Sequence, residues 1–158
     1  MGVDPAERLI FEYFWKDEEA DMRIFLIVLL AALIGVGLYV RLAPSDPGVW
    51  HAMPDEMEDV DMDGGAKRVV EAGQGALARL HAIALATPRT QVLAGSVDDG
   101  KITYVTRSRV FGFPDYTTVM QSEDTLKIHA RLRFGKFDLG VNAARVDAWI
   151  AELNRSGG

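Results

Sequence analysis

The sequence predicts an α+β protein in which an N-terminal transmembrane helix precedes a small domain. That domain is expected to contain a roughly four-stranded antiparallel sheet of two hairpins, with two packing helices. Three observations lead to this prediction. Residues 24–40 contain no charged side chain. Four strand-like stretches between residues 90 and 134 are joined in pairs by short turns. Two later stretches, 75–87 and 142–153, repeat apolar residues at helical spacing.

The apolar run comes first in the chain. Seventeen helical residues extend about 26 Å, which is close to the thickness of a hydrocarbon core. Arg23 and Arg41 bracket the run and can place their charges among headgroups. A buried core helix is the alternative, but a domain this small cannot surround a helix that is apolar on every face. Because Arg41 stands where a cleavage site needs a small residue, we expect an uncleaved anchor over residues 22–43.

Residues 1–21 form an N-terminal extension with two readings. Asp4, Pro5 and Glu7 resemble a helix start, and aromatic residues follow that could lie at a membrane interface. Alternatively, Met22 directly before the apolar run is typical of a natural start, so the extension would lie upstream of it. Arg23 and Arg41 nearly cancel in the positive-inside count. The export-like start then favours a single-pass protein of the bacterial inner membrane with its C-terminal domain in the periplasm.

Residues 44–65 are predicted to be an acidic, proline-containing linker. Residues 44–63 carry seven Asp and Glu and neither Lys nor Arg. Within them, 59–64 match the opening half of a calcium-binding loop, but Val70 stands where that loop needs a bidentate Glu. We therefore expect a solvated linker and no metal site.

Composition limits the chemistry of the remaining chain. The absence of cysteine excludes disulfides, thiol catalysis and thiolate metal sites. Residues 64–158 contain thirteen Lys and Arg against nine Asp and Glu. This mildly basic balance suits an anionic membrane surface and is too weak to indicate nucleic acid. The expected partners are the lipid bilayer and an anionic lipid or membrane-protein partner.

The domain itself is expected over residues 66–158. After a short strand candidate at Val69–Val70, a helix over 75–87 ends at Pro88 and presents one apolar face: Leu77, Leu80, Ile83 and Ala84. Strands 90–96 and 101–110 join across Asp98-Asp99-Gly100, and strands 115–121 and 125–134 join across 122–124. Asn142 is expected to cap a last helix whose apolar face carries Val146, Trp149, Ile150 and Leu153.

Alternation along residues 125–134 predicts two different sheet faces. The apolar residues at even positions should face the helices, and Lys127, His129, Arg131 and Arg133 should face the opposite way. If the hairpins are neighbours, Arg107 and Arg109 join Arg131 and Arg133 on that face. Such a face is either simply solvated or binds anions and headgroups, because guanidinium groups suit phosphate and carboxylate.

Two stretches carry a family resemblance. They are Ser108-Arg109-Val110-Phe111-Gly112-Phe113-Pro114-Asp115 and Gly135-Lys136-Phe137-Asp138-Leu139-Gly140-Val141-Asn142-Ala143-Ala144-Arg145. Together they resemble the paired signatures of the domain of unknown function family 1499, over about residues 69–154. Members often carry serine where this chain has Leu132 and Phe137. The resemblance implies a domain found in bacteria and plastids, often behind a membrane segment, with no established activity.

The candidate ligand-binding residues combine the basic sheet face with these signatures: Arg107, Arg109, Arg131, Arg133, Asp115, Asp138, Asn142 and Arg145. We expect no cofactor, no metal and no catalytic residue. The favoured hypothesis is non-enzymatic binding of a lipid, another anionic amphiphile or a membrane-protein partner. The alternative is an envelope-directed hydrolase or transferase that uses Asp115, Asp138, Asn142 and the arginines.

Overall fold

The structure, a computed structural model, describes residues 5–157 of the chain, with side chains from residue 18 onward. The chain divides into two compact units, Met1–Leu42 and Ala43–Gly158.

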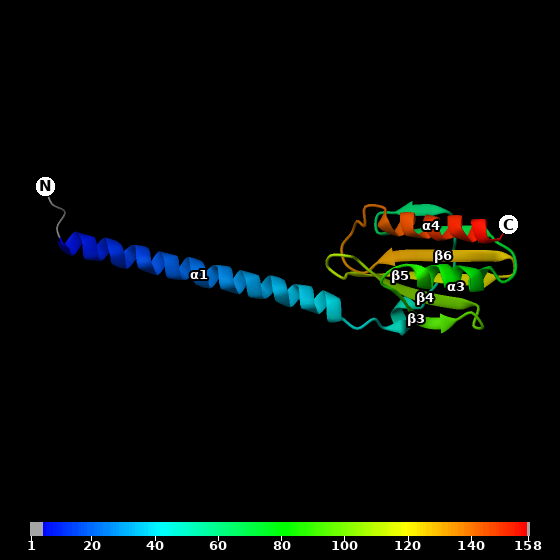
Figure 1. Ribbon diagram of the computed structural model, residues 1–158, viewed down its shortest axis with the longest axis horizontal. Coiled ribbons are helices and arrows are strands. Elements are labelled where there is room, and N and C mark those ends of the chain that lie inside the picture. The colour runs from blue at the N-terminus through cyan, green and yellow to red at the C-terminus, as the bar shows by residue number, and fades with distance from the viewer. Residues whose placement is uncertain (1–4, 158) are drawn as a thin grey trace. The chain divides into compact units, whose positions relative to one another are not determined.

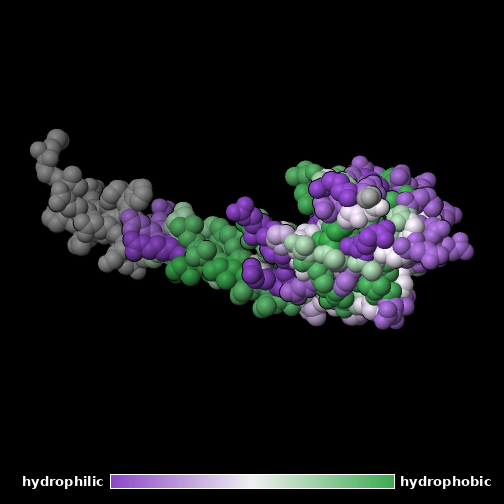
Figure 2. Space-filling model, turned by 45° about the vertical axis from the view of Figure 1, so that its right-hand side comes forward, coloured by the Kyte–Doolittle hydropathy of each residue, from purple (hydrophilic) through white to green (hydrophobic). Residues whose placement is uncertain are grey.

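The described part of the first unit is a single long helix, α1 (Pro5–Leu42). Within it, Glu18–Leu42 is long enough and apolar enough to cross a membrane. Its apolar side chains are exposed to the surroundings rather than packed in a core, and Figure 2 shows them as a continuous hydrophobic surface. A helix of this kind, apolar on all sides, has the length and composition of a single membrane span. The predicted cap at Asp4 lies outside the described residues.

The second unit is built on a six-stranded antiparallel sheet in the order β1-β2-β6-β5-β4-β3. The strands are β1 (Val60–Met62), β2 (Gly65–Glu71), β3 (Thr90–Ser96), β4 (Lys101–Arg107), β5 (Pro114–Ser122) and β6 (Thr125–Leu132). The helices are α2 (Pro47–Trp50), α3 (Ala76–Ala86) and α4 (Val141–Ser156). The α+β class and both predicted hairpins are confirmed, but four strands understate the sheet by β1 and β2.

β1 lies within the predicted linker, and β2 begins at its end and extends through the short strand candidate at Val69–Val70. β1 has three residues and an exposed Asp61 at its centre. β2 opens with Gly65, which is required at that place because a Cβ atom there would lie 2.1 Å from the carbonyl oxygen of Ala130. Glycine and aspartate are rare in strands, so β1 shows no strand pattern and only Val69–Val70 marks β2 in the sequence.

One face of the sheet carries the core. α3 and α4 lie side by side on this face (Figure 1). Both predicted helix faces are confirmed as core-facing, with Ile83 and Ile150 partly buried, and Leu126, Ile128 and Ala130 of β6 are buried. The cluster contains Leu77, Leu80, Ala84, Ile102, Tyr104, Val119, Leu126, Ile128, Ala130, Val146, Trp149 and Leu153. The unit from Ala43 onward thus has a hydrophobic core of its own.

The other face of the sheet is covered by residues 43–52, which we call the strap. Trp50 stacks on Tyr116 of β5, with ring centroids 4.0 Å apart. His51 Nδ1 lies 2.8 Å from Thr103 Oγ1, and the Arg131 guanidinium donates to the carbonyl oxygens of Trp50 and Ala52. The first half of the expected linker is therefore bound to the sheet, and the second half contains β1. The segment predicted as an acidic linker over 44–65 is thus packed into the second unit.

Candidate functional site

Two loops carry the signature residues, and both lie at the same end of the sheet (Figure 1). Residues 108–113 connect β4 to β5, and residues 133–140 connect β6 to α4. The antiparallel register brings them together, because Arg107 pairs with Pro114 and Asp115 pairs with Leu132. β4, which was predicted over residues 101–110, ends earlier, at Arg107. A turn closes there, since the amide of Phe113 donates to Ser108 Oγ at 3.0 Å.

Aromatic side chains connect the two loops. The ring centroids of Phe111 and Phe113 lie 5.4 Å apart, and those of Phe113 and Phe134 lie 6.1 Å apart. The loops nevertheless leave large apolar side chains in solvent. The exposed fraction is 76% for Val110, 66% for Phe111, 67% for Phe137 and 94% for Leu139. Gathered exposed apolar side chains are typical of surfaces that bind a partner or a membrane.

Basic side chains accompany these apolar ones. Arg109 and Lys136 are both exposed, one on each loop. We call the group formed by Arg109, Val110, Phe111, Lys136, Phe137 and Leu139 the two-loop surface. A cleft of about 380 Å³ opens at its edge and is lined by Asp61, Met62, Asp63, Phe137, Leu139 and Gly140. Apolar side chains beside basic ones can take an amphiphile with an anionic head.

The four arginines predicted to share one sheet face, Arg107, Arg109, Arg131 and Arg133, are not gathered on an open surface. Arg107 donates to the carbonyl oxygen of Gly112 at 3.0 Å and so holds the first loop. Arg131 is used to hold the strap. Arg133 donates to the carbonyl oxygen of Pro44 at 2.9 Å and to the Tyr116 hydroxyl at 3.1 Å. Of these four, Arg109 alone remains exposed. The basic face of β6 thus serves largely to bind the strap.

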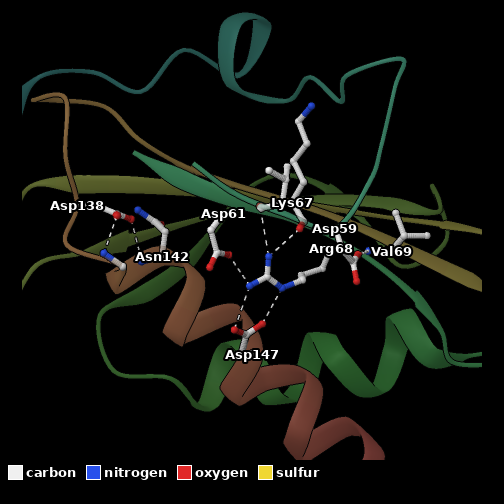
Figure 3. A network of polar contacts seen from close by, with 10 residues as sticks. Asp59, Asp61, Lys67, Arg68, Val69, Asp138, Asn142 and Asp147 are labelled. Carbon is white, nitrogen blue, oxygen red and sulfur yellow. Dashed lines mark hydrogen bonds and ion pairs between the residues drawn. The ribbon is translucent and has the colours of Figure 1, made fainter. Parts of the chain in front are cut away.

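Asp138 organises the crossing from β6 to α4 (Figure 3). Its carboxylate accepts hydrogen bonds from the amides of Gly140 and Asn142, each at 2.9 Å. Gly140 precedes the helix in a left-handed conformation with φ 77°, which favours glycine. The expected cap at Asn142 is wrong, because α4 already begins at Val141 and Asp138 satisfies the amides. A carboxylate two residues before Gly140 replaces the expected side-chain cap.

The Asn142 side chain instead belongs to a buried polar cluster. Arg145 Nη2 donates to Asn142 Oδ1, and Arg145 Nη1 lies 3.6 Å from a carboxylate oxygen of Asp115. The side chains of Arg145 and Asp115 are only 10% and 15% exposed, and Asn142 is fully buried. Burial raises the pKa of Asp115, although Arg145 and Asn142 oppose that change. Burial also lowers the pKa of Arg145. The structure thus brings together Asp115, Asn142 and Arg145, with Asp138 beside them.

This cluster is incompletely satisfied. Among the described residues, Asn142 Nδ2, Arg145 Nε and Thr117 Oγ1 are buried without a hydrogen-bond partner. Buried donors of this kind usually bind an ordered water or a polar ligand atom. The three side chains come from β5 and α4.

Sequence reasoning missed the role of Arg68 on β2 (Figure 3). Its guanidinium binds Asp147 on α4 at 2.8 Å and Asp61 on β1 at 2.7 Å. The hydrogen bond to Asp147 is the largest effect that raises the pKa of Arg68. Asp59 accepts a hydrogen bond from the amide of Val69 at 2.6 Å. Two acids of the calcium-like pattern therefore hold β2, and the side chains described, from residue 18 to residue 157, contain no cluster of three or more metal-binding groups.

Comparison with known proteins gives one finding. Residues 51–153 match the family described as "Protein of unknown function (DUF1499)". Searches of curated proteins and of solved structures gave no match. The matched region includes most of the buried core, both signature loops and the end of the strap. It covers more than half of the chain, so the chain belongs to this family of unknown function.

Proposed function

We propose that this protein is a membrane-anchored, non-enzymatic domain that binds an anionic lipid or another anionic amphiphile at the two-loop surface. The supporting observation is the exposure of Phe111, Phe137 and Leu139 beside Arg109 and Lys136. An acyl chain would cover the apolar side chains, and its anionic head would lie against the two cations. As part of the same proposal, the domain lies in the periplasm and its anchor in a bacterial inner membrane.

The alternative, an envelope-directed hydrolase or transferase, has weaker support. A raised pKa at Asp115 is what a general acid needs. However, the side chains of Asp115 and Arg145 are almost buried and contact each other. Asp138 uses both carboxylate oxygens for backbone amides. These groups are therefore better suited to stabilising the crossing into α4 than to contacting a substrate.

The test is a titration of the fragment 43–158, which keeps the strap and the whole core. The probe is dioctanoyl phosphatidylglycerol below its micelle-forming concentration, followed by amide chemical shifts. The shifts should concentrate in residues 109–112 and 136–141. Phe111→Ala and Phe137→Ala should each weaken binding about tenfold. Each variant removes a ring that the ligand would cover only in part, so about half of the free energy of burying a phenylalanine side chain is lost.

Val97→Ala is the matched control, because Val97 is an exposed apolar residue in the turn at the other end of β4. It should leave the affinity unchanged. Dioctanoyl phosphatidylcholine should bind more weakly than the anionic lipid, since its head carries no net charge. Shifts confined to another part of the fragment, or none at all, would refute amphiphile binding here.

A further inference from the structure

We propose that the two-loop surface docks onto the anionic surface of the bilayer that carries the anchor. This inference rests on the proposed function and adds the source of the ligand. The lipid belongs to the bilayer that holds the protein's own anchor. The inference follows from how the start of the second unit is fixed to the loops, from which side chains point outward there, and from their charge.

The first step concerns the start of the second unit. Ala43 directly follows Leu42, the last residue of the apolar helix. Arg133 holds this point to the domain, since it donates to the carbonyl oxygen of Pro44 at 2.9 Å and to that of Ala43 at 3.4 Å. Ser45 Oγ also lies 2.7 Å from the Tyr116 hydroxyl. The second unit is therefore held together from its first residue, and a membrane-inserted α1 would tether it covalently at that residue.

The second step follows the contacts from this point to the loops. The guanidinium carbon of Arg133 lies 5.1 Å from the ring centroid of Phe134. Phe134 contacts Phe113, which contacts Phe111. An unbroken series of side chains thus joins the start of the second unit to the tip of the first loop. The second loop begins at Arg133 itself.

The exposed side chains of the two loops have the chemistry of a membrane-binding surface. Aromatic and aliphatic side chains beside Lys or Arg are typical of surfaces that lie among lipid headgroups. Leu139 is nearly fully exposed and has a positive φ of 56°, which is uncommon for a residue other than glycine. Asp61 and Asp63 line the cleft on the side of β1. Those carboxylates would avoid an anionic surface, so the contact should centre on Arg109, Phe111 and Lys136.

The experiment uses the full chain in nanodiscs and exploits its lack of native cysteine. Phe111→Cys, Leu139→Cys and Val97→Cys are labelled singly with an environment-sensitive fluorophore. The lipid is phosphatidylcholine with or without phosphatidylglycerol, and brominated lipids report contact with the bilayer. At positions 111 and 139, the anionic discs should give a blue-shifted and quenched probe. At position 97, at the opposite end of β4, the probe should stay unquenched.

Charge is tested in the same discs. Arg109→Gln together with Lys136→Gln should lower the ratio of docked to undocked domain about thirtyfold. Each basic residue near an anionic surface adds to the free energy of docking, and this variant removes two of them. Lys101→Gln together with Lys127→Gln removes the same charge at the other end of the strands and should leave the ratio unchanged. These variants carry the label at Leu139→Cys.

Unquenched probes at positions 111 and 139, or equal quenching at 97 and 139, would overturn bilayer docking. The titration of fragment 43–158 with monomeric lipid separates this result from the proposed function. Lipid binding by the fragment without docking in nanodiscs would refute the inference alone. Docking of the full chain without binding of monomeric lipid would refute the proposed function instead and leave a purely interfacial contact.

Discussion

Trp50 stacks on Tyr116, with an angle of 18° between the ring planes and 4.0 Å between the centroids. Tyr116 is fully buried in the second unit, and the Arg131 guanidinium lies 5.4 Å from the Trp50 ring. A strap residue thus covers a buried tyrosine on the sheet face opposite the helices. Because Arg131 also donates to the carbonyl oxygens of Trp50 and Ala52, the strap satisfies a cation that would otherwise face solvent.

Trp50→Ala should lower the free energy of unfolding of fragment 43–158 by about 2 kcal/mol, since it removes half-buried aromatic area and a stacking partner. Urea denaturation followed by far-ultraviolet circular dichroism measures this. Val49→Ala is the neighbouring control, because Val49 is exposed, and it should change stability by less than about 0.5 kcal/mol. Equal stability of the two variants would show that the strap contributes nothing to the fold.

Asp138→Ala should destabilise the same fragment by about 1–3 kcal/mol, because it removes two acceptors from backbone amides at the start of α4. Asp138→Asn keeps one oxygen acceptor and should lose less. Thermal unfolding of both variants gives the comparison. A fully stable Asp138→Ala protein would contradict the role of Asp138 in the crossing and restore it as a candidate catalytic group.

Arg145→Met should cost about 3–5 kcal/mol, because it leaves the Asp115 carboxylate buried without its cation. The double variant Arg145→Met with Asp115→Asn removes both charges and should recover part of this loss. Chemical denaturation at neutral pH compares the two. Arg155→Ala breaks an exposed ion pair with Glu152 and should be nearly neutral. No recovery in the double variant would show that the two charges do not interact.

The features that were predicted best are those set by the regular spacing of apolar residues. The faces of α3 and α4, the two hairpins and the buried side of β6 all follow from period 3.6 or period 2. The arginines show where this reasoning stops. Alternation correctly placed Arg131 and Arg133 on the face away from the helices, but it could not show that this face is covered. The carbonyl oxygens that cover it come from Ala43, Pro44, Trp50 and Ala52, in a segment without apolar periodicity.

The candidate site was predicted in part for a similar reason. The signature positions Asp138, Asn142 and Arg145 do lie together, because i, i+4 and i, i+3 spacings bring residues together around the start of a helix. Arg68 was missed because one of its partners is distant in sequence: Asp147 lies 79 positions away. No local pattern marks such a pair. Exposure of the loop side chains is likewise a tertiary property that spacing does not determine.

His129 should make the folded domain less stable at acidic pH. Burial lowers the pKa of His129 from 6.5 to about 4, and the nearby charges of Arg131 and Lys67 add to the effect. Arg131 Nη1 lies 2.6 Å from His129 Nδ1, so this nitrogen accepts a hydrogen bond and the ring is neutral. The unfolded chain takes up a proton near pH 6.5, whereas the folded protein does so only near pH 4. Stability contributed by neutral His129 is therefore present above pH 6.5 and lost as the pH falls through this window.

His129→Gln keeps an acceptor for Arg131 but cannot take up the proton. Between about pH 7.5 and about pH 4.5, the parent fragment 43–158 should lose about 2 kcal/mol more of its unfolding free energy than the variant does. Urea denaturation at each pH measures the difference, and the carboxylates common to both proteins cancel. His51→Gln is the matched control, because burial also lowers the pKa of His51 but that variant retains His129. It should keep most of the acid sensitivity, and parallel stability curves for the parent and His129→Gln would show that His129 is protonated in the folded protein as readily as in the unfolded chain.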